Sequence, residues 1–249
     1  MKFGVSNIGW DFEKNDEIFE VLQKNKISYV EIAPTKICDW DDKDLLKKIK
    51  SYKKKLKKYN LKACGLQSIF FNKNINIFKE PNKFIQHFKH VIEIGKLLDV
   101  KYIVYGSPKT RVISEGDNLD VFINSFIEIS KIDKNINICI EPNPEEYGCN
   151  FITNMIECEN IVKKINKTNI KTHIDISEVI INSENIENFD LNICETAHIS
   201  NQKLQKIKKE YNHLYNKLFT LNLKFTTLES LKLNNKKDIE EQLSFIKST

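Results

Sequence analysis

Four side chains that could bind a metal ion recur along the second half of the sequence, each at or just after the end of a short apolar run. They are Glu141, Asp175, His198 and Glu229. Three carboxylates and one imidazole suit a hard or borderline divalent cation, and we expect Mn²⁺, with Mg²⁺, Co²⁺ and Zn²⁺ as alternatives. One such residue alone is more often a hydrogen-bonded polar group, but three carboxylates held together would repel one another unless a cation neutralised them. We therefore predict that the four residues form one metal site.

Such a site needs a fold that brings the ends of several strands to one place. Short runs rich in β-branched residues alternate with longer stretches in which apolar residues recur at helical spacing. We expect strands at residues 2–7, 29–32, 62–67, 102–105, 136–141, 170–175, 191–198 and 224–229. Helices are expected at residues 16–25, 42–59, 82–98, 119–130, 154–165, 203–218 and 237–246, with only a short, poorly defined helical stretch after the sixth strand.

This alternation predicts parallel βαβ units, and eight of them predict a closed (β/α)₈ TIM barrel. The 249 residues are the usual length of one such barrel, and no linker divides them, so residues 1–249 are expected to form a single domain. A doubly wound open sheet is the competing fold, but residues 7–10 after the first strand lack its usual G-x-G-x-x-G turn. In a TIM barrel the active site lies at the carboxyl ends of the strands, where the four expected ligands fall.

The composition indicates an ordinary globular protein, with 41% apolar and 29% charged residues. No apolar run approaches the roughly 20 residues that span a bilayer, and no signal peptide precedes the first strand, so we expect a cytoplasmic protein with no membrane partner. The net charge of +5 is modest, and the clustered lysines fit solvated helix faces, so no nucleic-acid partner is expected. The six cysteines form no C-x-x-C pair and are expected to be reduced and mostly buried.

Longer motifs around the expected ligands resemble those of the xylose isomerase-like, or sugar phosphate isomerase/epimerase, superfamily of TIM barrels. The resemblance covers nearly the whole chain and is most specific in Glu-Pro-Asn-Pro at 141–144, Tyr-Gly-Cys-Asn-Phe at 147–151, His-Ile-Asp at 173–175, His-Ile-Ser at 198–200 and Leu-Glu at 228–229. Gly-Ser-Pro-Lys at 106–109 with Arg111 is similar to a segment of one branch of the family. The resemblance implies that Glu141 and Glu229 bind the metal and serve as the acid/base pair. It also implies that Asp175 and His198 are the other ligands.

The implied activity is a metal-dependent isomerase or epimerase acting on a small polyhydroxy carbonyl substrate, with or without a phosphate group. Moving a proton at a carbon next to a carbonyl creates an enediolate, and a divalent ion can hold its oxygens. A carboxylate on each face can then remove the proton from one side and return it from the other. Members of the family are often dimers or tetramers, so a homo-oligomer is a further expectation.

Other polar residues near strand ends are candidates for substrate binding. Glu31 and Gln67 end the second and third strands and could bind substrate hydroxyls, with a supporting role behind the ligands equally open. Lys109 and Arg111, the only arginine, could clamp a phosphate or carboxylate, or could pair with surface acids such as those at 115 and 117. His173 should point to the same side of its strand as Asp175 and could orient a ligand or touch the substrate. Trp10 could form an apolar wall against a sugar.

Two departures from the family pattern leave other functions open. Family epimerases often carry a histidine where this chain has Glu178, whose carboxylate would disfavour an anionic substrate group or point to solvent. Residues 201–203, Asn-Gln-Lys, lack the arginine with which some epimerases hold their substrate. The runner-up functions are a metal-dependent dehydratase acting on an inosose and a catalytically silent sugar-binding relative. A nuclease that cuts at abasic sites is disfavoured, because His87, His90 and His213 are expected on helices.

Overall fold

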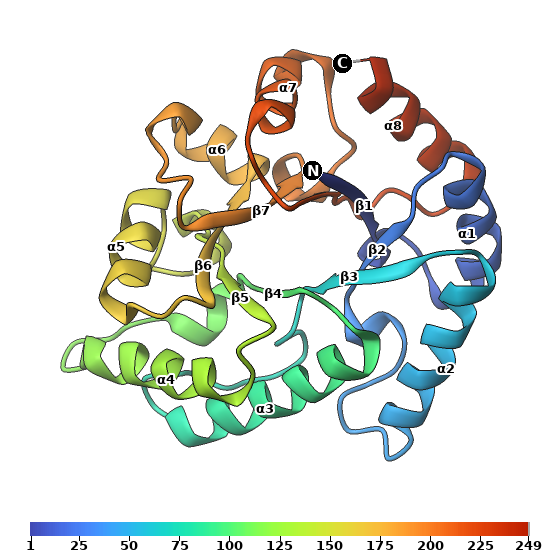
Figure 1. Ribbon diagram of the computed structural model, residues 1–249. Helices are drawn as coiled ribbons and strands as arrows, with labels where there is room; N and C mark the ends of the chain where they lie inside the picture. Colours follow the sequence, from blue (N-terminus) through green and yellow to red (C-terminus); the bar gives the residue numbers. More distant parts are fainter. Residues whose placement is uncertain (249) are drawn as a thin grey trace.

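Eight strands and eight longer helices alternate along the chain in the computed structural model, which describes residues 1–248 and the side chains of residues 1–246 (Figure 1). The strands are β1 (Lys2–Ser6), β2 (Tyr29–Ile32), β3 (Lys62–Leu66), β4 (Tyr102–Tyr105), β5 (Asn137–Ile140), β6 (Ile170–Asp175), β7 (Cys194–Ile199) and β8 (Phe225–Leu228). The helices are α1 (Asn15–Lys24), α2 (Leu45–Lys58), α3 (Pro81–Leu98), α4 (Leu119–Ile132), α5 (Met155–Ile165), α6 (Ile176–Asn182), α7 (Asn212–Thr220) and α8 (Lys236–Ser248).

The strands form a closed parallel barrel in the order β1 to β8, and β1 pairs with both β2 and β8. Figure 1 shows the strands at the centre and the helices in a ring around them. The sequence-based prediction of a (β/α)₈ barrel in one domain is therefore confirmed. None of the helices in residues 1–248 is both long and apolar enough to span a membrane.

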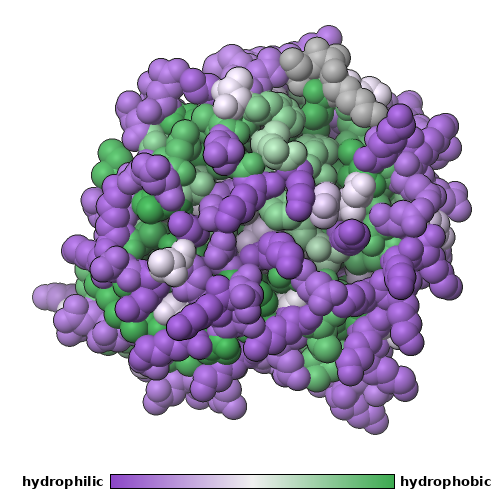
Figure 2. All heavy atoms as spheres, in the orientation of Figure 1, coloured by the Kyte–Doolittle hydropathy of each residue, from purple (hydrophilic) through white to green (hydrophobic). Residues whose placement is uncertain are grey.

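The helices pack on the barrel through one apolar stripe each. In α2 the buried side chains are Leu45, Ile49, Tyr52 and Leu56, which recur at helical spacing, while the intervening lysines are exposed or half-buried. Figure 2 shows hydrophilic residues around most of the rim of one face of the molecule, as expected where helices present their polar sides to water. The clustered lysines of α2 are thus part of a solvated helix face.

A separate cluster of apolar side chains fills the inside of the barrel. It consists of Cys64, Tyr102, Val104, Cys139 and Phe225. The Tyr102 hydroxyl lies 3.2 Å from Thr227 Oγ1. Because β4 and β8 are on opposite sides of the ring, this contact crosses the interior. The barrel is therefore a packed core, and ligands can enter only at its mouth.

The seventh helix differs from its prediction. We expected residues 203–218, but α7 begins only at Asn212, and the preceding segment forms short 3₁₀ turns at Gln202–Leu204 and Lys209–Tyr211. Lys203 and Leu204 have φ values of 53° and 51°. This left-handed backbone cannot continue a right-handed helix. The predicted helix is therefore wrong over its first half, and that half is a loop over the barrel mouth.

The sixth unit has no connecting loop at all. Asp175 is the last residue of β6 and also the N-cap of α6, where its side chain accepts a hydrogen bond from the backbone N–H of Glu178. The poorly defined helical stretch expected after the sixth strand is thus a short helix, and its first turn lies directly over the carboxyl end of the strand.

Candidate metal centre

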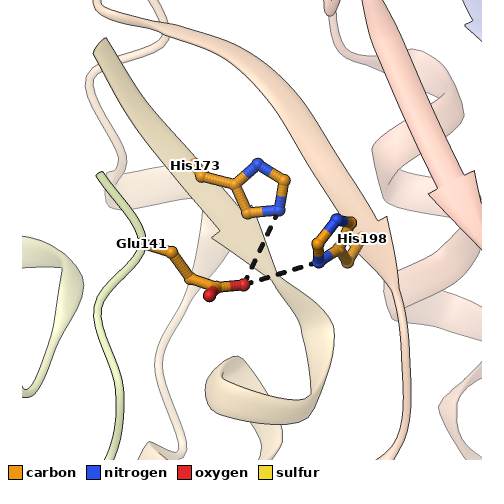
Figure 3. Close-up of side chains that lie close together, drawn as sticks. All are labelled: Glu141, His173 and His198. Atoms are coloured by element: carbon orange, nitrogen blue, oxygen red, sulfur yellow. Dashed lines mark ion pairs between the residues drawn. The ribbon is translucent and has the colours of Figure 1, made fainter. Parts of the chain in front are cut away.

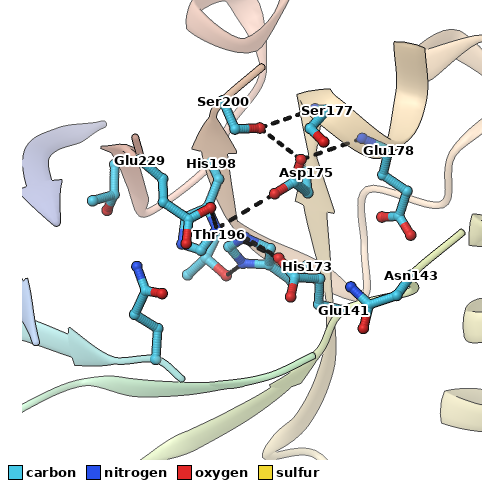
Figure 4. Close-up of polar contacts among 12 residues, drawn as sticks. Glu141, Asn143, His173, Asp175, Ser177, Glu178, Thr196, His198, Ser200 and Glu229 are labelled. Atoms are coloured by element: carbon cyan, nitrogen blue, oxygen red, sulfur yellow. Dashed lines mark hydrogen bonds and ion pairs between the residues drawn. The ribbon is translucent and has the colours of Figure 1, made fainter. Parts of the chain in front are cut away.

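Strand register brings the four predicted ligands to one level of the barrel. Asp175 is paired with His198 across β6 and β7. Glu141 directly follows β5, and its N–H donates to the carbonyl oxygen of Tyr105 on β4. Glu229 directly follows β8, and its N–H donates to the carbonyl oxygen of Ile199 on β7. All four side chains therefore project into the mouth at the carboxyl ends of the strands (Figure 4).

His198 Nδ1 lies at the centre of the three carboxylates. It is 3.2 Å from Glu229 Oε2, 3.4 Å from Glu141 Oε1 and 3.7 Å from Asp175 Oδ2. This nitrogen is buried and has no hydrogen-bond partner among the described residues. Ligand atoms about 2.1 Å from one shared metal ion lie roughly 3–4 Å apart. The donor atoms that lie within 4.8 Å of one another form two groups that share His198. One group is Asp175, His198 and Glu229, and the other is Glu141, His173 and His198. The chemistry of these donors fits a divalent ion beside His198.

The opposite nitrogen of His198 is held by a buried carboxylate. Glu31 Oε2 lies 2.8 Å from His198 Nε2, and the same oxygen accepts a hydrogen bond of 3.1 Å from Gln67 Nε2. Gln67 Nε2 also contacts Ser6 Oγ at 2.6 Å. A carboxylate behind a histidine fixes the ring and leaves its other nitrogen for the metal. Glu31 lies behind His198 and is not part of the pocket wall, so it has the supporting position that the sequence left open.

Asp175 is oriented by hydrogen bonds to one of its two oxygens. Its Oδ1 accepts from Ser200 Oγ at 2.6 Å and from the N–H of Glu178 at 3.3 Å. Ser200 Oγ in turn accepts from the N–H of Ser177 at 2.9 Å. These contacts leave Oδ2 directed at His198 (Figure 4).

His173 lies beside His198 and Glu141. Its Nδ1 is 2.7 Å from Thr196 Oγ1, and its Nε2 has no hydrogen-bond partner among the described residues and lies 3.8 Å from Glu141 Oε1 (Figure 3). Its ring meets that of His198 edge-on, with centroids 4.2 Å apart. Burial, and then His198, lower the pKa of His173 well below its ordinary value. A neutral His173 can therefore act as a further ligand or hold Glu141 in place.

The electrostatics of the cluster follow from burial and from the crowding of like charges. Burial, with Asp175 and Glu229 nearby, raises the pKa of Glu141 to about 7 against the opposing effect of His198. Burial alone would lower the pKa of His198, but the surrounding carboxylates of Glu31, Glu229, Asp175 and Glu141 outweigh it and raise that pKa well above its ordinary value. Without a cation the cluster thus holds protons at neutral pH.

A pocket of about 360 Å³ opens above the four predicted ligands. The loops after several strands form its wall: Ile8, Gln67, Ser68, Ser107, Pro108, Asn143, Tyr147, Ser177, Glu178, Lys203, Leu204 and Leu231. The Tyr147 hydroxyl lies 3.3 Å from Ser177 Oγ and accepts from the N–H of Lys203, also at 3.3 Å. One phenol thus joins the loops after β5 and β7 to the start of α6 at the rim. The pocket is large enough for a small polyhydroxy molecule.

Two predicted contacts with an anionic substrate do not reach this pocket. Arg111 is fully buried, and its guanidinium donates to Asn143 Oδ1 at 2.9 Å and to the carbonyl oxygens of Phe151 and Ile152 at 3.0 and 3.3 Å. It is therefore placed to fix the loop after β5. Lys109 is exposed and lines a neighbouring hollow. Its expected surface partner Asp117 pairs with Lys79 at 2.7 Å.

Trp10 and Glu178 also lie differently from what the sequence suggested. Trp10 is buried and donates through Nε1 to Asn15 Oδ1 at 3.0 Å, so it packs toward α1. The pocket wall after β1 is formed by Ile8 and not by Trp10. Glu178 is only 3% exposed, so the alternative in which it points to solvent is wrong. Burial, then Asp175 and Glu141, raise the pKa of Glu178 well above its ordinary value.

The sequence reasoning assigned no role to several supporting residues. Ser6, Asn143, Ser177, Thr196 and Ser200 hold or border the ligands, yet serine, threonine and asparagine are common at strand ends and give no distinct signal on their own. Ser200 and Asn143 could have been found from the motifs that contain His198 and Glu141. The rim residues Leu204 and Leu231 could not, because an apolar side chain in a loop has the same pattern as one in a helix.

The histidines divide clearly between the centre and the helices. His87 on α3 contacts the carbonyl oxygen of Ile69 at 2.7 Å, His90 lies 3.7 Å from Glu93 on the same helix, and His213 is exposed on α7. His173 and His198 are thus the two of the five that reach the barrel mouth, as the sequence indicated.

Comparison with known proteins places the chain among related barrels. Residues 19–218 match the family model described as xylose isomerase-like TIM barrel. No curated protein matches the sequence. A D-psicose 3-epimerase from Clostridium cellulolyticum H10, solved with D-tagatose, is similar with 13% identity and a TM-score of 0.74, over 100% of this chain and 99% of that one.

Two further solved structures are similar to this chain over nearly their whole length. The 3-keto-D-glucoside 4-epimerase YcjR from E. coli is 13% identical over 100% of both chains, with a TM-score of 0.75. The IolI protein, solved with a zinc atom, is 18% identical over 99% of this chain and 96% of that one, with a TM-score of 0.71. At such identities the likeness concerns the fold, whereas the family model covers most of the sequence itself. The chain belongs to the xylose isomerase-like TIM barrel family.

Proposed function

We propose that the protein is a metal-dependent sugar isomerase or epimerase that moves a proton at a carbon next to a carbonyl. The observation that carries the proposal is the position of His198 Nδ1 beneath an open pocket. This nitrogen is buried without a hydrogen-bond partner among the described residues and lies within 3.7 Å of Glu141, Asp175 and Glu229. These four residues would hold the ion, with Mn²⁺ as the proposed metal. When bound, a divalent ion supplies positive charge that stabilises an enediolate.

Glu141 and Glu229 are the proposed acid/base pair. They come from β5 and β8, on different sides of the barrel, and each directs a carboxylate oxygen into the floor of the pocket. One carboxylate would remove the proton from a substrate carbon, and the other would deliver a proton to the opposite face, which inverts that carbon. Return of the proton to the neighbouring carbon would give an isomer. Proton transfer of this kind contributes about 10²–10⁴-fold in rate.

The backbone around Glu141 is built to admit its carboxylate. A Cβ atom at Gly106 would lie 2.0 Å from Glu141 Oε2, so glycine at this position lets the carboxylate keep its place. Asn143, whose Oδ1 is held by Arg111, borders the pocket two residues further along. Arg111 is therefore proposed as a residue that positions the loop of Glu141, and Gln67 as one that contacts the substrate from the pocket wall.

The substrate class is proposed from the size and polarity of the pocket together with the related structures. Two of the three similar structures described above are named as sugar epimerases, and one of them was solved with the ketose D-tagatose. D-Tagatose and D-fructose, the ketose present with a second solved D-psicose 3-epimerase of this fold, are therefore the first compounds to test.

The test is solvent proton exchange. The Mn²⁺-loaded protein is incubated with each ketose in D₂O, and deuterium at the carbons next to the carbonyl is followed by NMR. We expect exchange in the wild type, a loss of at least about 10²-fold in Glu141→Gln and Glu229→Gln, and no loss in Glu146→Gln, an exposed residue of the same loop. Full exchange in Glu229→Gln would overturn the assignment. Release of water from an inosose, without exchange on ketoses, would identify the dehydratase, and binding without any reaction would identify a sugar-binding relative.

A further inference from the structure

A second hollow adjoins the pocket above the metal centre and has no part in the proposed reaction. It lies between the loops after β3 and β4, and its volume is about 630 Å³, against about 360 Å³ for the metal pocket. Ser68, Ser107 and Pro108 line both spaces. A molecule whose reacting end lies over the metal centre can therefore extend into the second hollow.

The two spaces differ in charge. Glu141, Asp175 and Glu229 line the metal pocket, and Lys203 at its rim is the one lysine or arginine in the described wall. Among the described residues that line the second hollow, the only charged side chains are Lys73 and Lys109. An anionic group on a ligand is therefore attracted to the second hollow and not to the floor of the metal pocket.

Both lysines are available to a ligand. Lys109 is exposed, and its Nζ has no hydrogen bond or ion pair within residues 1–248. Lys73 Nζ lies 2.7 Å from Asp41 Oδ1, but the side chain of Asp41 is 90% exposed. An ion pair so open to water contributes little to stability, so Lys73 can exchange this partner for a ligand. Two amines in one wall suit a diphosphate.

Phe71 adds an aromatic ring to the same wall. The residue is 59% exposed, although the loop that carries it is anchored. Trp40 Nε1 donates to the carbonyl oxygen of Phe71 at 2.9 Å. His87 Nε2 lies 2.7 Å from the carbonyl oxygen of Ile69. An aromatic ring that is held exposed on an anchored loop is suited to stack against a planar base.

The passage between the two spaces has a constrained backbone. Ser68 and Ser107, which line both, have φ values of 52° and 37°, in the left-handed region that residues other than glycine seldom adopt. Thr110 holds Ser107 in place, because its N–H and its hydroxyl donate to the carbonyl oxygen of Ser107 at 3.0 and 2.8 Å. Backbone held in such conformations is concentrated at ligand-binding sites.

The size, the charge and the ring together select one kind of occupant. A phosphoryl group alone would leave Phe71 uncovered, and a second sugar ring would leave the two lysines without an anion. A nucleoside diphosphate matches both features, because its phosphates suit the lysines and its base suits the aromatic ring. We propose that the second hollow binds the nucleoside diphosphate part of a nucleotide-linked sugar, whose sugar ring lies over the metal centre.

This inference deepens the proposed function and rests on it for the placement of the sugar. In a nucleotide-linked sugar the diphosphate occupies the anomeric carbon. The carbonyl group that directs the proton transfer would therefore lie at another carbon of the sugar ring.

Binding measurements test the inference without requiring turnover. Isothermal titration calorimetry is made with UDP-glucose, ADP-glucose and glucose 1-phosphate, on Mn²⁺-loaded protein from which free metal has been removed. We expect at least one nucleotide sugar to bind about tenfold or more tightly than glucose 1-phosphate, because the base and the second phosphoryl group add contacts. Binding of both nucleotide sugars no tighter than that of glucose 1-phosphate would overturn the inference.

Two variants locate the binding. Phe71→Ala should weaken binding of the nucleotide sugar by about tenfold and leave that of glucose 1-phosphate within about twofold, because only the nucleotide has a base to stack. Lys109→Ala should weaken nucleotide binding by about tenfold and reduce its dependence on salt. Phe219→Ala on α7 and Lys89→Ala on α3, both exposed and outside the two spaces, should match the wild type.

Unfolding temperature and metal content show that each variant is folded and loaded. Unchanged nucleotide binding in both Phe71→Ala and Lys109→Ala would overturn the inference. Analytical ultracentrifugation tests whether a second copy of the chain covers the ring instead. A dimer that dissociates in Phe71→Ala would also overturn the inference.

Outcomes for this inference and for the proposed function are distinct. A nucleotide sugar that binds through Phe71 and Lys109, without solvent proton exchange on any keto sugar, would keep the inference and overturn the proposed function. Solvent proton exchange on free ketoses, without preferential binding of either nucleotide sugar, would keep the proposed function and overturn the inference.

Discussion

Glu31 Oε2 and His198 Nε2 lie 2.8 Å apart, although 167 positions separate the two residues in the sequence. Neither side chain is accessible to solvent to more than 1%. The contact turns the imidazole so that Nδ1 faces Glu141, Asp175 and Glu229. Glu31 thus decides which nitrogen of His198 is offered to a metal ion, and several predictions depend on that geometry.

Replacing Glu31 should weaken metal binding without removing a ligand. In Glu31→Gln the carboxylate that fixes His198 is lost, and changes of this kind typically reduce metal affinity by about 10–100-fold. The affinity is measured by competition with a chelator of known strength. Glu20→Gln, on the exposed face of α1, is the matched control. Equal affinities in Glu31→Gln and the wild type would show that the contact does not support the site.

Metal affinity should rise with pH through neutrality. The pKa of Glu141 is raised to about 7 and that of His198 is raised well above its ordinary value, so both groups carry protons in the metal-free protein at pH 6 to 7. An ion must displace these protons, so its affinity should increase by up to about two decades per pH unit. Calorimetry in two buffers of different ionisation enthalpy counts the protons released. An affinity that stays constant between pH 6 and 8 would contradict this prediction.

The same pKa shifts determine the stability of the metal-free protein. A group whose pKa is raised on folding contributes stability below its unfolded pKa, and that contribution is lost as the pH rises through the folded pKa. Glu141 should therefore make the metal-free protein less stable as pH rises from about 4.5 to about 7. Chemical denaturation across this range should show the fall, which Glu141→Gln should reduce. A steady rise in stability through this range, unchanged in Glu141→Gln, would contradict the prediction.

A bound ion should stabilise the fold measurably. At a metal concentration about a thousandfold above Kd, the gain is about 4 kcal/mol. For a protein of this size each kcal/mol shifts Tm by about 2–4 °C, which gives a rise of roughly 8–16 °C over the chelator-treated protein. Differential scanning calorimetry with Mn²⁺ and with EDTA measures the difference. An identical Tm in both would show that the folded protein does not bind the ion.

Gly106→Ala should impair the reaction more than the fold. The new methyl group would meet Glu141 Oε2 at 2.0 Å, and the far end of a glutamate side chain can move aside at little cost to stability. Displacing that carboxylate by about 1 Å should nevertheless reduce turnover by about 10²-fold. Exchange kinetics and Tm are compared in the same variant. Unchanged turnover would indicate that the position of Glu141 is not critical.

The barrel, and the convergence of Glu141, Asp175, His198 and Glu229 at its mouth, could be predicted because local pattern and closure are both visible in the sequence. Short β-branched runs alternate with helical stripes, and residues that end strands of a closed barrel must share one mouth. The short distance between Glu31 and His198 could not be predicted. It depends on the stagger of β2 and β7 around the ring and on the side-chain conformations inside it.

The loop over the mouth shows where sequence reasoning fails. Residues 203–211 have the spacing of an amphipathic helix, yet Lys203 and Leu204 adopt a left-handed backbone, and Leu204 accepts hydrogen bonds from the N–H of Leu231 and from Ser230 Oγ. These tertiary contacts outweigh the local preference of residues 203–211 for a helix. The burial of Arg111 and Glu178 follows from how loops fold back onto the barrel, and composition favours the surface for both residue types.

The most direct test of the account is the metal content of the purified protein by elemental mass spectrometry, compared with the Asp175→Ala/His198→Ala double variant after reconstitution with Mn²⁺. The account predicts about one divalent ion per chain in the wild type and almost none in the variant, with both proteins folded. Absence of metal from the wild type after reconstitution, or equal content in the two proteins, would contradict the assignment of this centre.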